Sequence, residues 1–162
     1  IILMDQRGAG RSSPHGCLEN NTTKHLIEDI EGLRTSLQIN SWALVGGSWG
    51  ATLAIAYAQA YPEHVDRMVL RSVFLGSEPE LMRAFIEIPK KFYPEVFEAF
   101  IAPLSIDERN STLYSYYQLI LSSDQKTASI ASHLWHDYER ILSVIPPQQQ
   151  TIDDFKRLSE SG

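Results

Sequence analysis

The most informative part of the sequence is Val45-Gly46-Gly47-Ser48-Trp49-Gly50-Ala51, where an apolar run ends, a serine follows and an alanine-rich stretch begins. Residues 42–45 suit a strand buried on both faces, and residues 51–61 favour a helix. A serine between a strand and a helix, with a glycine two residues away on each side, is typical of a nucleophile elbow. We expect Gly46 and Gly50 to give this tight turn the room that it needs.

This pattern makes Ser48 the candidate nucleophile of a hydrolase. The turn would place the backbone N–H of Trp49 at the N-terminus of a helix, beside the serine hydroxyl. There it could stabilise the oxyanion of a tetrahedral intermediate. The alternative is a purely structural turn in which Ser48 only caps the helix.

Composition excludes several classes of protein. The 162 residues are 43% hydrophobic, which is enough for one domain with a core. The net charge is −6 and the basic residues are scattered singly, so no nucleic-acid partner is expected. Cys17 is the only cysteine, which excludes an internal disulfide and fits a reducing compartment such as the cytoplasm. No apolar run approaches the length of a membrane span, so no membrane partner is expected either.

Three apolar runs are predicted to form strands of one parallel sheet: Ile1–Met4, Trp42–Val45 and the apolar part of residues 65–74. The chain starts within the first of these runs, so we expect its N-terminus to lie further upstream. Apolar residues at helical spacing predict a helix between the first two runs; they are Leu26, Ile30, Leu33 and Leu37. Strands that alternate with helices indicate an α/β fold.

The pattern changes after Gly76, where strand signals stop and helical patterns follow. Helices are predicted at Pro79–Ile88, Tyr93–Ile101, Ile106–Leu121 and Gln125–Leu142. We therefore predict a core segment at residues 1–76, a helical cap at 77–145, and a linker or the start of a further cap element at 146–162.

The loop Asp5–Ser12 contains two glycines that invite comparison with a dinucleotide-binding loop. The third small residue of that fingerprint would fall on Ser13, and no helical periodicity begins there. No cofactor is therefore expected.

A serine nucleophile needs a base, which in this kind of fold follows it in the chain as a histidine. His64 is expected at the end of the sheet opposite Ser48, and His133 and His136 lie in the helical region. We expect the base to lie outside this chain, with His133 or His136 as the alternative. The same two histidines could also face one metal ion, but a third ligand is not evident, and no metal is expected.

Glu139 lies close to Trp135, His136 and Tyr138 on an aromatic-rich helix of the region that could cover Ser48. A carboxylate among aromatic side chains could bind an amine. The alternative is an exposed glutamate paired with Arg140 or left free.

Four motifs together resemble prolyl aminopeptidase (proline iminopeptidase), a serine peptidase family of the α/β-hydrolase fold. They are Asp5-Gln6-Arg7-Gly8-Ala9-Gly10-Arg11-Ser12, Asn21-Thr22-Thr23, Gly46-Gly47-Ser48-Trp49-Gly50 and Tyr57-Ala58-Gln59-Ala60-Tyr61-Pro62. The resemblance covers essentially the whole chain and implies a partial α/β-hydrolase fold, a parallel sheet segment with a helical cap insertion. It also implies a peptide substrate with a free N-terminal proline, cleaved through Ser48.

The resemblance assigns a role to Glu139 as well. The family's cap binds the free α-amine through acidic residues, one of which closes a W-x-x-W-E pattern that Trp135–Glu139 resembles. Tyr138 stands in place of the second tryptophan, which could alter the shape of the pocket and its preference for proline.

The resemblance implies that an H-G-G-P-G oxyanion loop precedes Ile1 and that the catalytic Asp and His follow Gly162. Residues 1–162 alone are then expected to be inactive, to carry a gap in the sheet between Ile1–Met4 and Trp42, and to be misassembled, domain-swapped or unstable. A carboxylesterase-type hydrolase, or a non-catalytic binding protein on a decayed hydrolase fold, is the alternative. The oligomeric state is left open.

Overall fold

Two short parallel strands organise the first part of the chain. β1 (Trp42–Gly47) pairs with β2 (Val65–Arg71), in a register that runs from Trp42 opposite Val65 to Gly47 opposite Arg71. Parallel neighbours require a crossover connection, which helix α2 (Trp49–Ala60) supplies together with the short 3₁₀ turn Pro62–His64. The predicted alternation of strand and helix is confirmed here.

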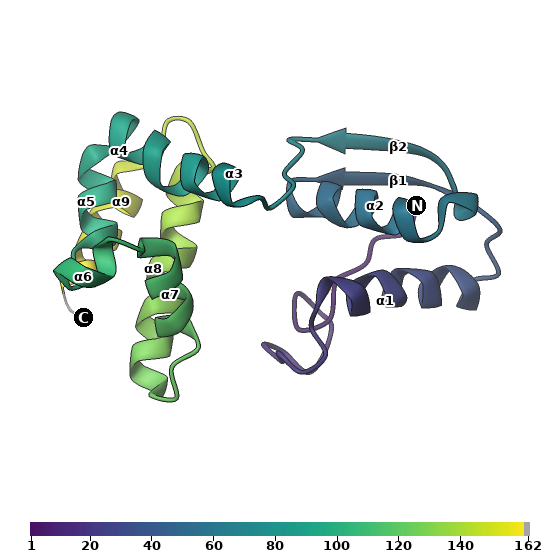
Figure 1. Cartoon of the computed structure of the whole chain (residues 1–162), viewed down its shortest axis with the longest axis horizontal. Coiled ribbons are helices and arrows are strands. Elements are labelled where there is room, and N and C mark those ends of the chain that lie inside the picture. Colours follow the sequence, from purple (N-terminus) through teal and green to yellow (C-terminus); the bar gives the residue numbers. More distant parts are fainter. Residues whose placement is uncertain (161–162) are drawn as a thin grey trace. The chain divides into compact units, whose positions relative to one another are not determined.

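The computed structural model describes residues 1–160, which divide into two compact units between Glu80 and Leu81. Figure 1 labels the helices and strands of both units. The domain boundaries predicted at residues 76 and 145 stay predictions.

In the first unit the helices lie in layers on one side of the sheet. α2 packs on β1, and α1 (Thr23–Ser36) packs on α2 (Figure 1). Within residues 1–80 no helix covers the opposite face, where the paired residues Val45 and Val69 remain 81% and 60% exposed. This sheet is therefore half covered, whereas the sequence indicated strands buried on both faces.

The strand predicted at Ile1–Met4 is not formed. These residues pair with neither described strand, and Ile1 and Leu3 are 119% and 90% exposed. A strand exists only through ladder hydrogen bonds to a neighbour, and a cavity of about 470 Å³ separates this segment from β1. The cavity lies where the sequence resemblance implies a gap in the sheet, and its other walls include Leu33, Leu53 and Tyr57.

From Glu78 to Glu160 all regular elements are helical, as predicted. The helices are α3 (Glu78–Met82), α4 (Ile88–Phe92), α5 (Pro94–Ile101), α6 (Ile106–Arg109), α7 (Thr112–Ile120), α8 (Gln125–Leu142) and α9 (Gln149–Glu160).

Two of the predicted helices differ in detail from those observed. A π-helical turn, Arg83–Glu87, joins α3 to α4, so that Pro89 lies in the first turn of α4, where a proline is tolerated, and does not end a helix. The single helix predicted at Ile106–Leu121 is two helices. A capping box of Ser105 and Glu108 starts the four-residue α6, and a new helix starts after Ser111.

An aromatic stack forms the core of the second unit. The Phe100 ring lies between the rings of Tyr116 and Tyr138, with centroid separations of 4.2 and 3.8 Å and nearly parallel planes. Both phenol groups are satisfied, since Tyr116 donates to the carbonyl of Phe100 and Tyr138 to that of Phe85, each at 2.7 Å. This core gives the helical unit an interior of its own.

Candidate active site

The turn at Ser48 has the local geometry that the sequence predicts. β1 ends at Gly47, α2 begins at Trp49, and Ser48 between them has φ 51° and ψ −121°. A positive φ is strained for any residue with a side chain and persists only where neighbouring structure enforces it. Here the Ser48 N–H donates to the carbonyl of Arg71 at 3.0 Å, and its own carbonyl accepts from Ala51 N–H at 2.9 Å. Ser48 is thus fixed between the end of β2 and the first turn of α2.

Gly46 is indispensable to this turn, whereas Gly50 is not. A Cβ at Gly46 would lie 2.3 Å from the carbonyl oxygen of Gly50, so no other residue fits. A Cβ at Gly50 would meet no described atom within 4 Å outside its own helix backbone. The expectation that both glycines provide necessary room is therefore correct for Gly46 and wrong for Gly50, because a Cβ at Gly50 would meet open space.

Ser48 itself is exposed, and within residues 1–160 nothing hydrogen-bonds to its hydroxyl group. The first N–H groups of a helix have no intrahelical acceptor, and that of Trp49 is the first in α2. The turn therefore presents a hydroxyl next to a free helix N-terminus, where developing negative charge is stabilised. Such an arrangement suits nucleophilic attack on a carbonyl, once a base is supplied.

The side chain of Trp49 is tied to the N-terminal segment. Its indole Nε1–H donates to Oε1 of Gln6 at 3.1 Å, although the ring remains 39% exposed. The sequence drew attention to the loop that contains Gln6 through its glycines, and gave no signal for this contact.

Arg71 is a second residue that sequence reasoning missed. It is the last residue of β2, and its Nη2 lies 3.1 Å from the position that a Cβ on Gly47 would occupy. Among the described residues its guanidinium has no ion-pair or hydrogen-bond partner, so it can receive an anionic group beside the elbow. The signal was available, because Arg71 lies at the carboxyl end of a strand parallel to the one that ends just before Ser48.

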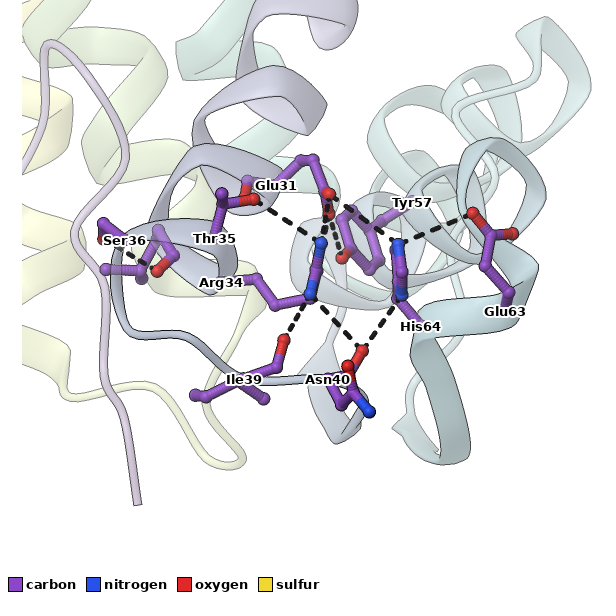
Figure 2. A network of polar contacts seen from close by, with 10 residues as sticks. Glu31, Arg34, Thr35, Ser36, Ile39, Asn40, Tyr57, Glu63 and His64 are labelled. Atoms are coloured by element: carbon purple, nitrogen blue, oxygen red, sulfur yellow. Dashed lines mark hydrogen bonds and ion pairs between the residues drawn. The ribbon is translucent and has the colours of Figure 1, made fainter.

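A polar network occupies the other end of the sheet (Figure 2). Glu31 of α1 accepts two hydrogen bonds from Arg34, at 2.6 and 2.9 Å, and one from the Tyr57 hydroxyl of α2 at 2.7 Å. His64, just before β2, lies 3.9 Å from Glu31 and 3.0 Å from the carbonyl of Asn40. The register places His64 with the start of β1, away from Ser48, so it cannot act as the base.

The charges in this network are strongly coupled. Hydrogen bonds from Arg34 and then from Tyr57 lower the pKa of Glu31 to about 2, against the effect of burial. Burial and the bond to Glu31 raise the pKa of Tyr57 to about 12. Glu31 is therefore ionised, and Tyr57 neutral, at every ordinary pH.

The histidines of α8 are not arranged as a metal site. His133 Nδ1 lies 2.7 Å from the carbonyl of Ser129 in its own helix. Within residues 1–160, no three His, Cys, Asp or Glu side chains gather in a way that could hold a metal ion.

Glu139 and Tyr138 face different surroundings although they are adjacent in α8. Tyr138 is fully buried in the aromatic stack, so it fills the core and does not line an open surface of its unit. Glu139 as a whole is exposed, but its carboxyl group is partly buried, and this burial raises its pKa. The charge of His136 and a hydrogen bond from Trp135 act in the opposite direction. The Arg140 guanidinium binds Asp137 at 3.2 Å, so the alternative pairing of Glu139 with Arg140 is not observed.

Comparison with known proteins gives consistent matches. Residues 1–159 match the family model described as alpha/beta hydrolase fold. Over 161 residues the chain is 38% identical to a proline iminopeptidase of Neisseria meningitidis, covering 98% of this chain and 52% of that protein. It is 40% identical to a proline iminopeptidase of Xylella fastidiosa and 39% identical to one of Arabidopsis thaliana, each over 94% of this chain. It covers 49% and 40% of those two proteins, so the chain spans about half the length of the curated relatives it matches.

The same comparisons confirm the resemblance predicted from the four sequence motifs.

In the described part of the chain, no helix has the length and apolarity needed to cross a membrane.

Proposed function

The chain belongs to the α/β-hydrolase fold family, and from that premise we propose that it carries the nucleophile of a serine aminopeptidase that releases N-terminal proline from peptides. The observation that carries the proposal is the strained Ser48 at the N-terminus of α2. The choice of substrate is supported by relatives named proline iminopeptidase at 38–40% identity.

In the proposed reaction the Ser48 hydroxyl attacks the carbonyl carbon of the N-terminal proline, and its proton passes to a general base. The backbone N–H of Trp49 donates to the oxyanion of the tetrahedral intermediate. The peptide bond breaks, the rest of the peptide leaves as an amine that takes the proton, and an acyl-enzyme remains. Water then releases proline and regenerates Ser48. We propose, from the sequence resemblance, that the base is a histidine beyond Gly162, paired with an aspartate.

We assign Glu139 to the free α-amine of the substrate. The amine has a reference pKa near 8, so it is a cation through the neutral range. The ion pair forms at pH values above the raised pKa of Glu139 and below the pKa of the amine. Preference for free-amine over amine-blocked substrates therefore falls below this window as Glu139 gains a proton, and above it as the amine loses one.

A lone cysteine and the net charge of −6 support a cytoplasmic peptidase that acts on peptides and not on nucleic acid.

The test measures hydrolysis of a prolyl arylamide by the polypeptide that the whole gene encodes and by the 162-residue chain. In the whole-gene polypeptide, Ser48→Ala should abolish activity, while Ser36→Ala, at the exposed end of α1, should not change it. Activity that survives Ser48→Ala contradicts the proposal. Ser48-dependent activity in the 162-residue chain itself would return His133 or His136 to consideration as the base.

A second arm of the same experiment separates the aminopeptidase from a carboxylesterase. Glu139→Gln should raise KM for the prolyl arylamide at least tenfold and leave a simple ester nearly unaffected. Asp137→Asn, two residues away on α8, is the matched control. Equal effects of Glu139→Gln on the amine-bearing substrate and on the ester would contradict the assignment and favour the esterase.

A further inference from the structure

Trp49 reaches back across the chain to a single acceptor. Its indole N–H meets Oε1 of Gln6 at 3.1 Å, over a separation of 43 residues, which is within the usual range for a hydrogen bond. The indole N–H is the only polar group of this side chain, and among the described residues Gln6 is its hydrogen-bond acceptor, although the ring is 39% exposed. The ring lies directly after Ser48 in sequence, at the first position of α2.

Gln6 can act as an anchor because hydrogen bonds hold the loop that contains it. The Asp5 carboxylate accepts from the Arg11 backbone N–H at 2.9 Å, and the Asp5 carbonyl accepts from the Ser12 hydroxyl at 2.7 Å. Gly10 has φ 57°, and a Cβ there would lie 2.4 Å from the Asp5 side chain, so the loop closes tightly on itself.

The loop is also fixed to the helical layer beneath it. Arg7, next to Gln6, forms a two-point ion pair with Asp29 of α1 at 2.5 and 2.7 Å, and donates to the carbonyl of Asn20 at 2.9 Å. The Asn21 side-chain amide donates to the carbonyl of Arg7 at 3.3 Å. Gln6 therefore presents its carbonyl oxygen from a position fixed on both sides.

From these contacts we infer that Gln6 is a positioning residue for the elbow. Its side-chain carbonyl holds the Trp49 indole and so fixes the residue whose backbone N–H is assigned to the oxyanion. The inference rests on the proposed function, since it assigns Gln6 to the reaction at Ser48. Because the oxyanion forms only on the way to the tetrahedral intermediate, a displaced Trp49 N–H should lower kcat and leave substrate binding unchanged.

The first measurement is independent of activity. In the ¹⁵N-tryptophan NMR spectrum of the whole-gene polypeptide, the Trp49 indole N–H signal, assigned by its loss in Trp49→Phe, should shift upfield and exchange faster in Gln6→Met. Gln6→Glu keeps an acceptor oxygen and should restore both properties. Gln59 is an exposed glutamine of α2, the helix that contains Trp49, and Gln59→Met should leave the signal unchanged. A signal that does not respond to Gln6→Met overturns the hydrogen bond and with it the inference.

The second measurement is kinetic. Gln6→Met should lower kcat for the prolyl arylamide about three- to tenfold with KM unchanged, as expected for one solvent-accessible hydrogen bond. Gln6→Glu should recover most of this loss, and Gln6→Met should add nothing in a Trp49→Phe background. A change in KM alone, or additive losses in the double variant, overturns the positioning role. If the protein shows no Ser48-dependent activity at all, the proposed function fails, and the indole signal still reports separately on the Gln6 contact.

Discussion

At the scale of single residues, Gly46 and Gly50 occupy mirrored positions around Ser48 but experience opposite surroundings. The backbone of Gly50 crosses directly over Gly46, so a methyl group on Gly46 has nowhere to go without moving α2 away from β1. Gly50 projects into open space from the first turn of a helix. The pair therefore offers a matched test of the elbow.

We expect Gly46→Ala to lower the free energy of unfolding by about 3 kcal/mol or more, because the clash is with main-chain atoms that cannot rotate away. Gly50→Ala should remain within about 1 kcal/mol of the wild type, since alanine favours helix and meets no obstacle. Urea denaturation of both variants measures the difference. Similar losses in the two would show that the backbones do not cross as closely as described.

Residue types and spacing were sufficient to predict the elbow, because a serine between strand and helix requires small neighbours. They could not distinguish the two glycines, since the direction of each missing Cβ depends on where α2 leaves β1. Gln6 escaped prediction for a related reason, because it meets the elbow through a long-range contact that no local pattern in the sequence encodes. Arg71 was missed although its place at the carboxyl end of a neighbouring parallel strand was a usable signal.

At the scale of elements, the polar network around Glu31 joins elements that are far apart in the sequence. It links α1, α2, the loop before β1 and the turn before β2 (Figure 2). Most of its members are only partly accessible, so an uncompensated charge there would be costly. It holds the end of the sheet that lies away from Ser48.

Glu31→Gln should cost about 1–3 kcal/mol at pH 7, since the bonds from Arg34 and Tyr57 lose their ionic character. The folded-state pKa of Glu31 is about 2 and that of an unfolded glutamate is about 4.3, so its contribution is complete above the latter value and disappears as the pH falls towards 2. The gap in unfolding free energy between wild type and Glu31→Gln should therefore narrow between about pH 5 and pH 2.

Glu28→Gln is the control for this measurement. Glu28 lies on the same helix, and its ion-pair partner within residues 1–160 is Lys24, at 3.8 Å and largely in solvent, so the loss of its charge should change stability by less than about 0.5 kcal/mol. If the difference in unfolding free energy between the wild type and Glu31→Gln stays constant as the pH falls, the low pKa of Glu31 is contradicted.

Elements with strong periodicity were predicted well, and those that depend on partners were not. Residues 125–142 form the predicted helix to the residue, because an Asp124 cap begins it and a continuous apolar face sustains it. The apolar run Ile1–Met4 has the composition of a strand, yet composition cannot supply the neighbour that a ladder requires.

At the scale of the whole molecule, the two units differ in how completely their apolar residues are covered. The helical unit encloses an aromatic core, whereas the sheet of the first unit has two strands and one bare face. A two-stranded sheet is marginal unless it is well packed. We therefore expect the amides of β1 and β2 to exchange with deuterium faster than those of α8 in the 162-residue chain.

Hydrogen-exchange mass spectrometry measures this directly, and it also tests the expectation from sequence that residues 1–162 alone assemble poorly. Phe100→Ala, which empties the centre of the aromatic stack, should accelerate exchange in α8 without altering α2. Equal protection of strands and α8, or loss of protection in both units from this one variant, would contradict independent cores.

The aromatic stack also gives the helical unit optical properties of its own. The ring centroids of Tyr116 and Phe100 lie within 6.0 Å of that of Trp135. At this distance, energy absorbed by Tyr116 is transferred to Trp135 before the tyrosine can fluoresce. Rings held so rigidly in an asymmetric setting also absorb left- and right-circularly polarised light unequally. The unit thus carries an intrinsic spectroscopic probe. Its tryptophan fluorescence and its near-ultraviolet circular dichroism report, without any added label, whether the aromatic core is intact.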